Sequence, residues 1–155
     1  MTAHLSVPNG HPAFRLGAAS LLLSALLAGQ AWAQAATMRQ ASPKGAQVYF
    51  HYPLDGLRVP ERFTVRIGLK EMGVAPAGTS WPNSGHHHLL IDTEAGPPDQ
   101  PIPADYNNVH LGNGQTEVVV TLPKGTHTLQ LLLGDHTHTP HNPPVMSRKI
   151  TVYVR

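Results

Sequence analysis

The chain has 155 residues, with 11 Lys and Arg against 9 Asp and Glu, which gives a formal net charge of +2. This near balance, with no cluster of Lys or Arg, argues against nucleic acid or an anionic lipid surface as a partner. Cysteine is absent, so disulfides, thiolate chemistry and Cys-ligated zinc are excluded and the fold must rest on its apolar core.

The first 33 residues have the pattern of a secretory signal peptide. Arg15 is their only charged residue, residues 16–27 (LGAASLLLSALL) are an apolar core, and Ala31-Trp32-Ala33 is a cleavage signal. A transmembrane anchor would need about 20 apolar residues. We therefore expect an exported chain, periplasmic or secreted, that starts at Gln34 and does not insert into the membrane after cleavage.

Residues 34–45 are expected to be a flexible lead-in, and residues 46–155 to form a single His-rich domain. Several of its segments alternate apolar and polar residues with period two, as in FTVRIGLK (63–70), which is typical of half-buried strands. No segment after the signal peptide shows a helical stripe. The expected strands are residues 46–52, 62–70, 86–92, 116–122, 126–134 and 148–155.

Turn-forming residues separate these strands, as in PLDG (53–56), LPKG (122–125) and the Pro-rich GPPDQPIP (96–103). Six or seven short strands without helices predict an all-β, immunoglobulin-like antiparallel sandwich. Residues 93–109 are expected to be a long loop, of a length that is often functional. In such a sandwich the strands at 86–92 and 126–134 are antiparallel neighbours.

Histidine is the unusual feature, because nine of the eleven lie after residue 33. The start of the strand at 86–92 should lie beside the end of the strand at 126–134, so most of these histidines should meet at one end of the sandwich. His51 and His127 fall at the opposite end. Within the run at 86–88, side-chain alternation places His86 and His88 outward, about 7 Å apart, and His87 inward with the core.

Two imidazoles at this spacing can both reach a metal ion. We therefore predict a site for copper or zinc, the metals that imidazole suits. Asp92 and Asp135 are the carboxylates best placed to orient a ligand, and Met72 and Met146 offer thioethers. The candidate ligands are His86, His88, His110, His136, His138 and His141.

Two other interpretations stay open. The His-rich end could be a structural surface, or could contact a protein partner without metal. A metalloenzyme would need an open coordination position and an acid or base beside the metal. The chain contains neither G-x-S-x-G nor H-E-x-x-H, so nothing in the sequence requires an enzyme.

The strings VYFHYPLDG, GHHHLLID, GQTE, GDHTHTPHNPP and KITVYV resemble a bacterial exported family, domain of unknown function 4399. The resemblance covers about residues 46–155. It implies an exported, compact β domain whose His-rich strings are its most distinctive feature. The resemblance does not imply any particular activity.

Overall fold

The computed structural model describes residues 39–155, so the predicted signal peptide lies outside the described residues. The described chain forms nine strands and no helix. Accordingly, residues 39–155 contain no helix that is long and apolar enough to span a membrane. The all-β fold predicted from the alternating segments is confirmed.

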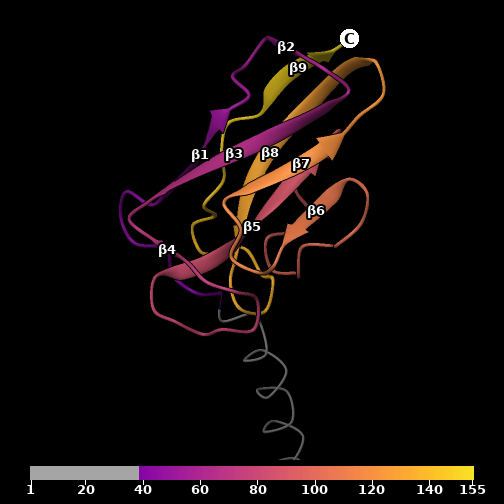
Figure 1. The fold of residues 1–155 in the computed structure, drawn as a ribbon. Helices are drawn as coiled ribbons and strands as arrows, with labels where there is room; N and C mark the ends of the chain where they lie inside the picture. Colours follow the sequence, from indigo (N-terminus) through magenta and orange to yellow (C-terminus); the bar gives the residue numbers. More distant parts are fainter. Residues whose placement is uncertain (1–38) are drawn as a thin grey trace, which may run out of the picture. The chain divides into compact units, whose positions relative to one another are not determined.

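The strands form two sheets that face each other, as the two layers of Figure 1 show. The smaller sheet has the order β1 (Gln47–Tyr52), β3 (Arg62–Lys70) and β7 (Glu117–Thr121). The larger sheet has the order β2 (Leu57–Val59), β9 (Ile150–Val154), β8 (Gly125–Gly134), β5 (Ser84–Ile91) and β4 (Gly73–Val74), and β6 (Asn108–Leu111) also pairs with β5.

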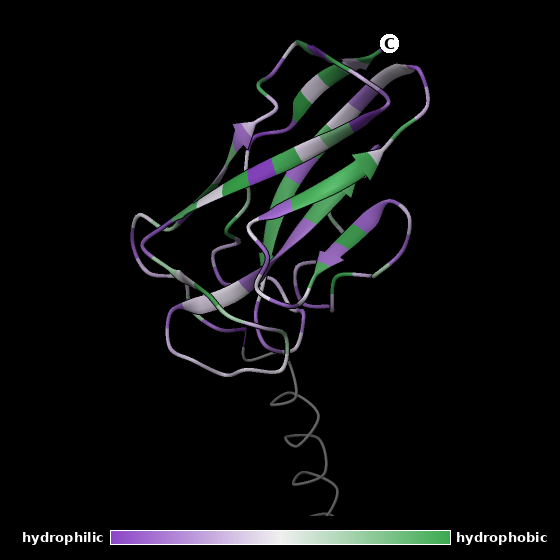
Figure 2. Ribbon diagram, in the orientation of Figure 1, coloured by the Kyte–Doolittle hydropathy of each residue, from purple (hydrophilic) through white to green (hydrophobic). Residues whose placement is uncertain are grey.

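The core fills the space between the two sheets. Along β3, the side chains of Phe63, Val65 and Ile67 are at most 5% exposed, while Arg62 and Arg66 on the other face are exposed. Figure 2 shows this alternation as bands of contrasting colour along the strand. Because side chains alternate across a strand, the period-two pattern in the sequence sets which side chains enter the core.

The predicted pairing of the two central strands is confirmed. β5 and β8 run antiparallel, with His86 opposite Gly134 and His88 opposite Leu132. The expected long loop is shorter than predicted, because β6 begins at Asn108 and pairs with the other side of β5. This strand has only four residues, too few for period-two alternation to be recognised between its polar neighbours.

His127 is the third residue of β8, near the position where a tyrosine often sits in immunoglobulin-like domains. Its Nδ1 lies 2.6 Å from Asp92 Oδ2, and its Nε2 lies 2.9 Å from the carbonyl oxygen of Pro123, four residues upstream. Both ring nitrogens thus face acceptors. Burial by itself would lower the pKa of His127, but these hydrogen bonds outweigh it and raise the pKa above its ordinary value. The ring therefore has a structural role, joining the start of β8 to Asp92 and Pro123.

Candidate metal centre

All eight residues of β5 are buried, so both faces of this strand are covered. One face carries His87, Leu89 and Ile91 into the core between the sheets. The other face carries His86, His88 and Leu90, and Leu90 packs against Ile102 of the Pro-rich segment. The predicted separation of the three histidines onto two faces is therefore confirmed, although the outward face lies beneath loops rather than at the surface.

Four imidazoles converge on this covered face. His86 and His88 come from β5, His110 from β6 and His138 from the loop after β8. The ring centroid of His86 lies 4.9 Å from that of His88, 5.0 Å from that of His110 and 4.9 Å from that of His138. Those of His110 and His138 are 4.8 Å apart. We call these four residues the four-histidine cluster.

The strand register creates this convergence. His88 and His110 are direct cross-strand partners in the β5–β6 ladder, so their side chains leave the sheet on the same face. His138 reaches the same face from the loop that continues β8, which is the other neighbour of β5. The cluster is consequently assembled from three segments that are far apart in the sequence.

The spacing of the nitrogens suits a metal ion. One ring nitrogen from each of His86, His110 and His138 can be chosen so that all lie within 4.8 Å of one another, and His88 Nε2 lies 3.0 Å from His86 Nε2. A tetrahedral ion bound at about 2.0–2.1 Å would hold its nitrogen ligands roughly 3.4 Å apart. Small rotations of these rings would reach that geometry.

The cluster is also poor in hydrogen bonds. Within the cluster, His86 and His88 form a hydrogen bond through their Nε2 atoms. Three other ring nitrogens are buried without a hydrogen-bond partner: His86 Nδ1, His88 Nδ1 and His110 Nε2. Buried polar groups in proteins are normally paired, and leaving one unpaired costs about 1–3 kcal/mol. Imidazole nitrogens that lack a protein partner are available to bind a cation.

The electrostatics keep these rings uncharged. Burial, followed by the repulsion of His138 and His110, lowers the pKa of His86 to about 4. Burial, followed by the repulsion of His86, lowers the pKa of His88 to about 3. Burial and His138 also lower the pKa of His110. At neutral pH the rings of His86, His88 and His110 are therefore neutral, the form in which imidazole binds metal.

Two glycines make room for the cluster, and no motif in the sequence singled them out. A Cβ atom added at Gly112 would lie 2.2 Å from Cε1 of His110. One added at Gly134 would lie 3.0 Å from His88 Nε2 and 3.3 Å from the Cα of His138. The sequence offered one indication of this role, which is position: Gly112 directly follows β6, and Gly134 is the last residue of β8.

His138 has a strained backbone, with a φ angle of 69°. A non-glycine residue in this left-handed region costs about 1–2 kcal/mol. The conformation is held by the Asp135 carboxylate, which accepts hydrogen bonds from the backbone N–H groups of Thr137 (2.8 Å) and Thr139 (3.0 Å). The N–H of Ile102 also donates to the His138 carbonyl oxygen at 2.9 Å. Strain that its surroundings maintain in this way is typical of functional positions.

Replacing His138 by glycine should weaken metal binding without lowering the stability of the fold. Glycine relieves the left-handed strain, so we expect the free energy of unfolding of His138→Gly to stay the same or to rise by up to about 1 kcal/mol. The same change removes one imidazole of the cluster, and metal affinity should fall. Urea unfolding and metal titration measure the two effects. His136→Gly is the matched control, because His136 has an ordinary φ and glycine there should lower stability; a stability loss in both variants would contradict the prediction.

Two of the six candidate ligands do not join the cluster. Nδ1 of His136 accepts a hydrogen bond from the side-chain amide of Gln40 at 3.1 Å. His141 is fully buried, with Nε2 3.2 Å from the carbonyl oxygen of Ser84 and Nδ1 3.5 Å from that of Leu133. The structure places both rings against protein groups of their own.

Neither predicted carboxylate hydrogen-bonds to a ring of the cluster. Asp135 holds the turn at residues 135–139, and its many hydrogen bonds lower its pKa even though burial would raise it. Asp92 is engaged by His127 and by the backbone of Thr128. The prediction that these side chains orient a ligand ring was wrong, because the backbone turns that contain them use their oxygens.

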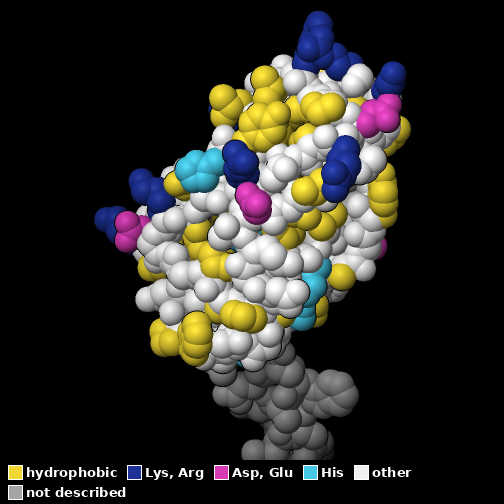
Figure 3. Space-filling view, in the orientation of Figure 1, with side chains coloured by type: hydrophobic (Ala, Val, Ile, Leu, Met, Phe, Trp, Pro, Cys, Tyr) yellow, Lys and Arg dark blue, Asp and Glu magenta, His cyan; other side chains and the backbone are white. Residues whose placement is uncertain are grey.

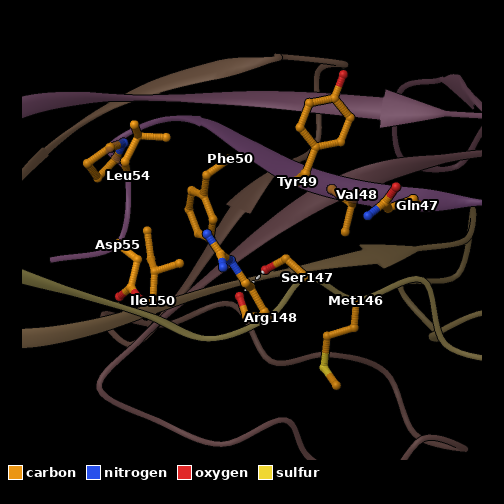
Figure 4. Close-up of a pocket in the computed structure, with 11 residues that line it drawn as sticks. Gln47, Val48, Tyr49, Phe50, Leu54, Asp55, Met146, Ser147, Arg148 and Ile150 are labelled. Carbon is orange, nitrogen blue, oxygen red and sulfur yellow. Dashed lines mark hydrogen bonds between the residues drawn. The ribbon is translucent and has the colours of Figure 1, made fainter. Parts of the chain in front are cut away.

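The two methionines among residues 39–155 lie apart from the cluster as well. Met72 packs against the core between the sheets. Met146 is bridged to Leu132, which in turn pairs with His88, so two strand spacings, or about 10 Å, separate Met146 from His88. Figure 4 shows Met146 at a cleft of about 220 Å³ between β1 and the segment that leads into β9. No histidine lines this cleft.

The surface reflects this internal arrangement. The described residues contain nine histidines, yet histidine occupies only small, separate areas of the face shown in Figure 3. Of the four-histidine cluster, His86 and His88 are completely buried, and His110 and His138 are half-buried. An ion would therefore enter past His110 and His138.

The family described as "Domain of unknown function (DUF4399)" matches residues 65–155. The chain belongs to this family. The matched region contains all four rings of the cluster, whereas β1 and the residues before it precede the match.

A solved structure, the endo-beta-1,4-mannanase from Thermotoga petrophila, is similar to this chain with a TM-score of 0.44 and 16% sequence identity. The similarity covers 72% of this chain and 20% of that one, so this chain spans about a fifth of that protein. A likeness at this level carries no conclusion about function. No curated protein matches the chain.

Proposed function

We propose that this domain is an exported metal-binding protein that holds one Cu(II) or Zn(II) ion through His86, His88, His110 and His138. The observation that carries the proposal is the convergence of four imidazoles that share one hydrogen bond among them. Export is supported by the signal-peptide pattern of residues 1–33.

The donor set favours these metals. Imidazole suits zinc and copper, and the Irving–Williams order places Cu(II) above the other divalent ions of the first transition row. The chain has no cysteine, and among residues 39–155 the methionines Met72 and Met146 lie away from the rings, so the described residues offer them no thiolate or thioether ligand of the kind that selects Cu(I). The site would thus favour the divalent ions.

The number of ligands favours binding over catalysis. Catalytic zinc sites keep three protein ligands and an open position for water, whereas sites with four protein ligands are closed. Four imidazoles would fill a tetrahedral coordination shell. This arrangement suits a protein that stores, delivers or senses a metal.

Titration calorimetry of residues 34–155 with Zn(II) and with Cu(II) tests the proposal. We expect one ion per chain, bound with better than micromolar affinity. A His86→Ala/His88→Ala double variant should bind at least roughly 100-fold more weakly, beyond the range of 10–100-fold typical of outer-shell changes. His51→Ala is the matched control, because His51 is an exposed histidine of β1 outside the cluster.

Absence of binding by the wild-type protein would overturn the proposal. The histidine-rich end would then be a structural or partner-binding surface. Binding that survives in the double variant would also contradict it, since the ion would lie elsewhere.

A further inference from the structure

The segment before β1 lies against the loop that carries His138. Ala41 pairs in parallel with Asn142. The N–H of Asn142 donates to the carbonyl oxygen of Gln40 at 2.8 Å, and the N–H of Ser42 donates to that of Asn142 at 3.1 Å. We call residues 39–42 the strap. It belongs to the expected flexible lead-in, and it precedes the region that matches the family.

Arg39 connects the strap to Pro140 and His141, which follow His138 by two and three residues. Its Nε donates to the carbonyl oxygen of Pro140 at 2.9 Å, and its guanidinium also donates to the carbonyl oxygen of His141. Pro140 itself is buried and bridges to Gly134. Hydrogen bonds from a charged donor are roughly twice as strong as neutral ones, and the planar guanidinium fixes two acceptors at once.

Gln40 acts on the other side of His138. Its side-chain amide donates to Nδ1 of His136 at 3.1 Å. The backbone carbonyl oxygen of His136 is held separately, by the N–H of Gly78 at 3.0 Å. The strap therefore contacts the loop both before and after His138.

We infer that the strap positions His138 for metal binding, so that the affinity of the four-histidine cluster depends on Arg39 and Gln40. This inference rests on the proposed function. The left-handed backbone of His138 persists only where its surroundings hold it. The strap supplies part of that support, and it does so without contributing a ligand, so Arg39 and Gln40 are positioning residues.

An Arg39→Ala/Gln40→Ala double variant of residues 34–155 tests the inference, with Cu(II) as the probe. We expect the affinity for Cu(II) to fall about 10–100-fold, and the electron paramagnetic resonance spectrum of bound Cu(II) to change as His138 shifts. Arg39→Lys, which keeps the charge and a donor, should recover part of the affinity. Lys44→Ala is the matched control, because Lys44 is exposed just beyond the strap.

Amide hydrogen exchange in the metal-free proteins gives a readout that does not depend on metal. The amides of Asn142, His138 and Asp135 should exchange faster in the double variant, while those of β8 keep their protection. If the wild type binds Cu(II) and the double variant binds it with the same affinity, the inference is overturned and the proposed function stays intact. Absence of binding by the wild type would overturn both.

Discussion

Replacing His87 by leucine should raise the free energy of unfolding at pH 7 by about 1–3 kcal/mol. His87 is fully buried on the core face of β5, and neither of its ring nitrogens has a hydrogen-bond partner. Leu133 and Leu111 are its cross-strand neighbours. A leucine side chain would fill much of the same space without an unpaired polar group.

The same variant should withstand acid better. Burial lowers the pKa of His87 to about 4, from an ordinary value of 6.5. In the unfolded chain the ring takes up a proton below pH 6.5, whereas the folded protein keeps it neutral until about pH 4. The stability linked to this group is thus fully present above pH 6.5 and is lost as the pH falls towards 4. The loss is on the order of 3 kcal/mol, because a tenfold difference in proton affinity between the two states corresponds to about 1.4 kcal/mol.

Urea unfolding at pH 7.5 and pH 4.5, with a chelator present, measures both effects. The difference between His87→Leu and wild type should be larger at pH 4.5. The histidines at 86 and 88 titrate in both proteins, and removing the repulsion of His87 raises their pKa values, which adds to the same difference. An exposed-site control is His51→Leu, which should change the stability little. Lower stability of His87→Leu at pH 7.5 would mean that the ring has a polar partner in solution.

Gly85→Ala is expected to destabilise the domain severely, by about 3 kcal/mol or more. A Cβ atom at this position would lie 2.5 Å from the carbonyl oxygen of Gly134, 3.0 Å from Cε1 of His141 and 3.0 Å from Cγ of Leu133. The first of these is a backbone atom at the end of β8. It could move only by separating β5 from β8, the strands that position His86 and His88.

Gly96→Ala is the matched control, since a Cβ atom there meets nothing within 4 Å. It should leave stability unchanged or raise it slightly, because alanine has fewer unfolded conformations than glycine. The midpoint of chemical denaturation distinguishes the two variants. Equal midpoints would show that the ends of β5 and β8 do not approach each other as closely as described.

The sequence by itself determined the six longest strands and their faces, but not the short strands β2, β4 and β6. Alternation is a local property, so the pattern of Phe63, Val65 and Ile67 was enough to orient β3, and the pattern of Leu89 and Ile91 was enough to separate His87 from His86 and His88. The absence of helices and the spacing of the turns then favoured a sandwich. These inferences required no knowledge of distant contacts.

The tertiary structure decided which histidines meet. His110 joins the cluster because a four-residue strand pairs with β5 in the register that sets it opposite His88, and a segment so short carries almost no local signal. His136 and His138 lie in a loop where the period-two rule of strands does not apply. The Asp135 turn and the left-handed backbone at His138 send one ring to the cluster and leave the other with Gln40. Such placement depends on hydrogen bonds between segments about 100 residues apart, which periodicity within any one segment cannot encode.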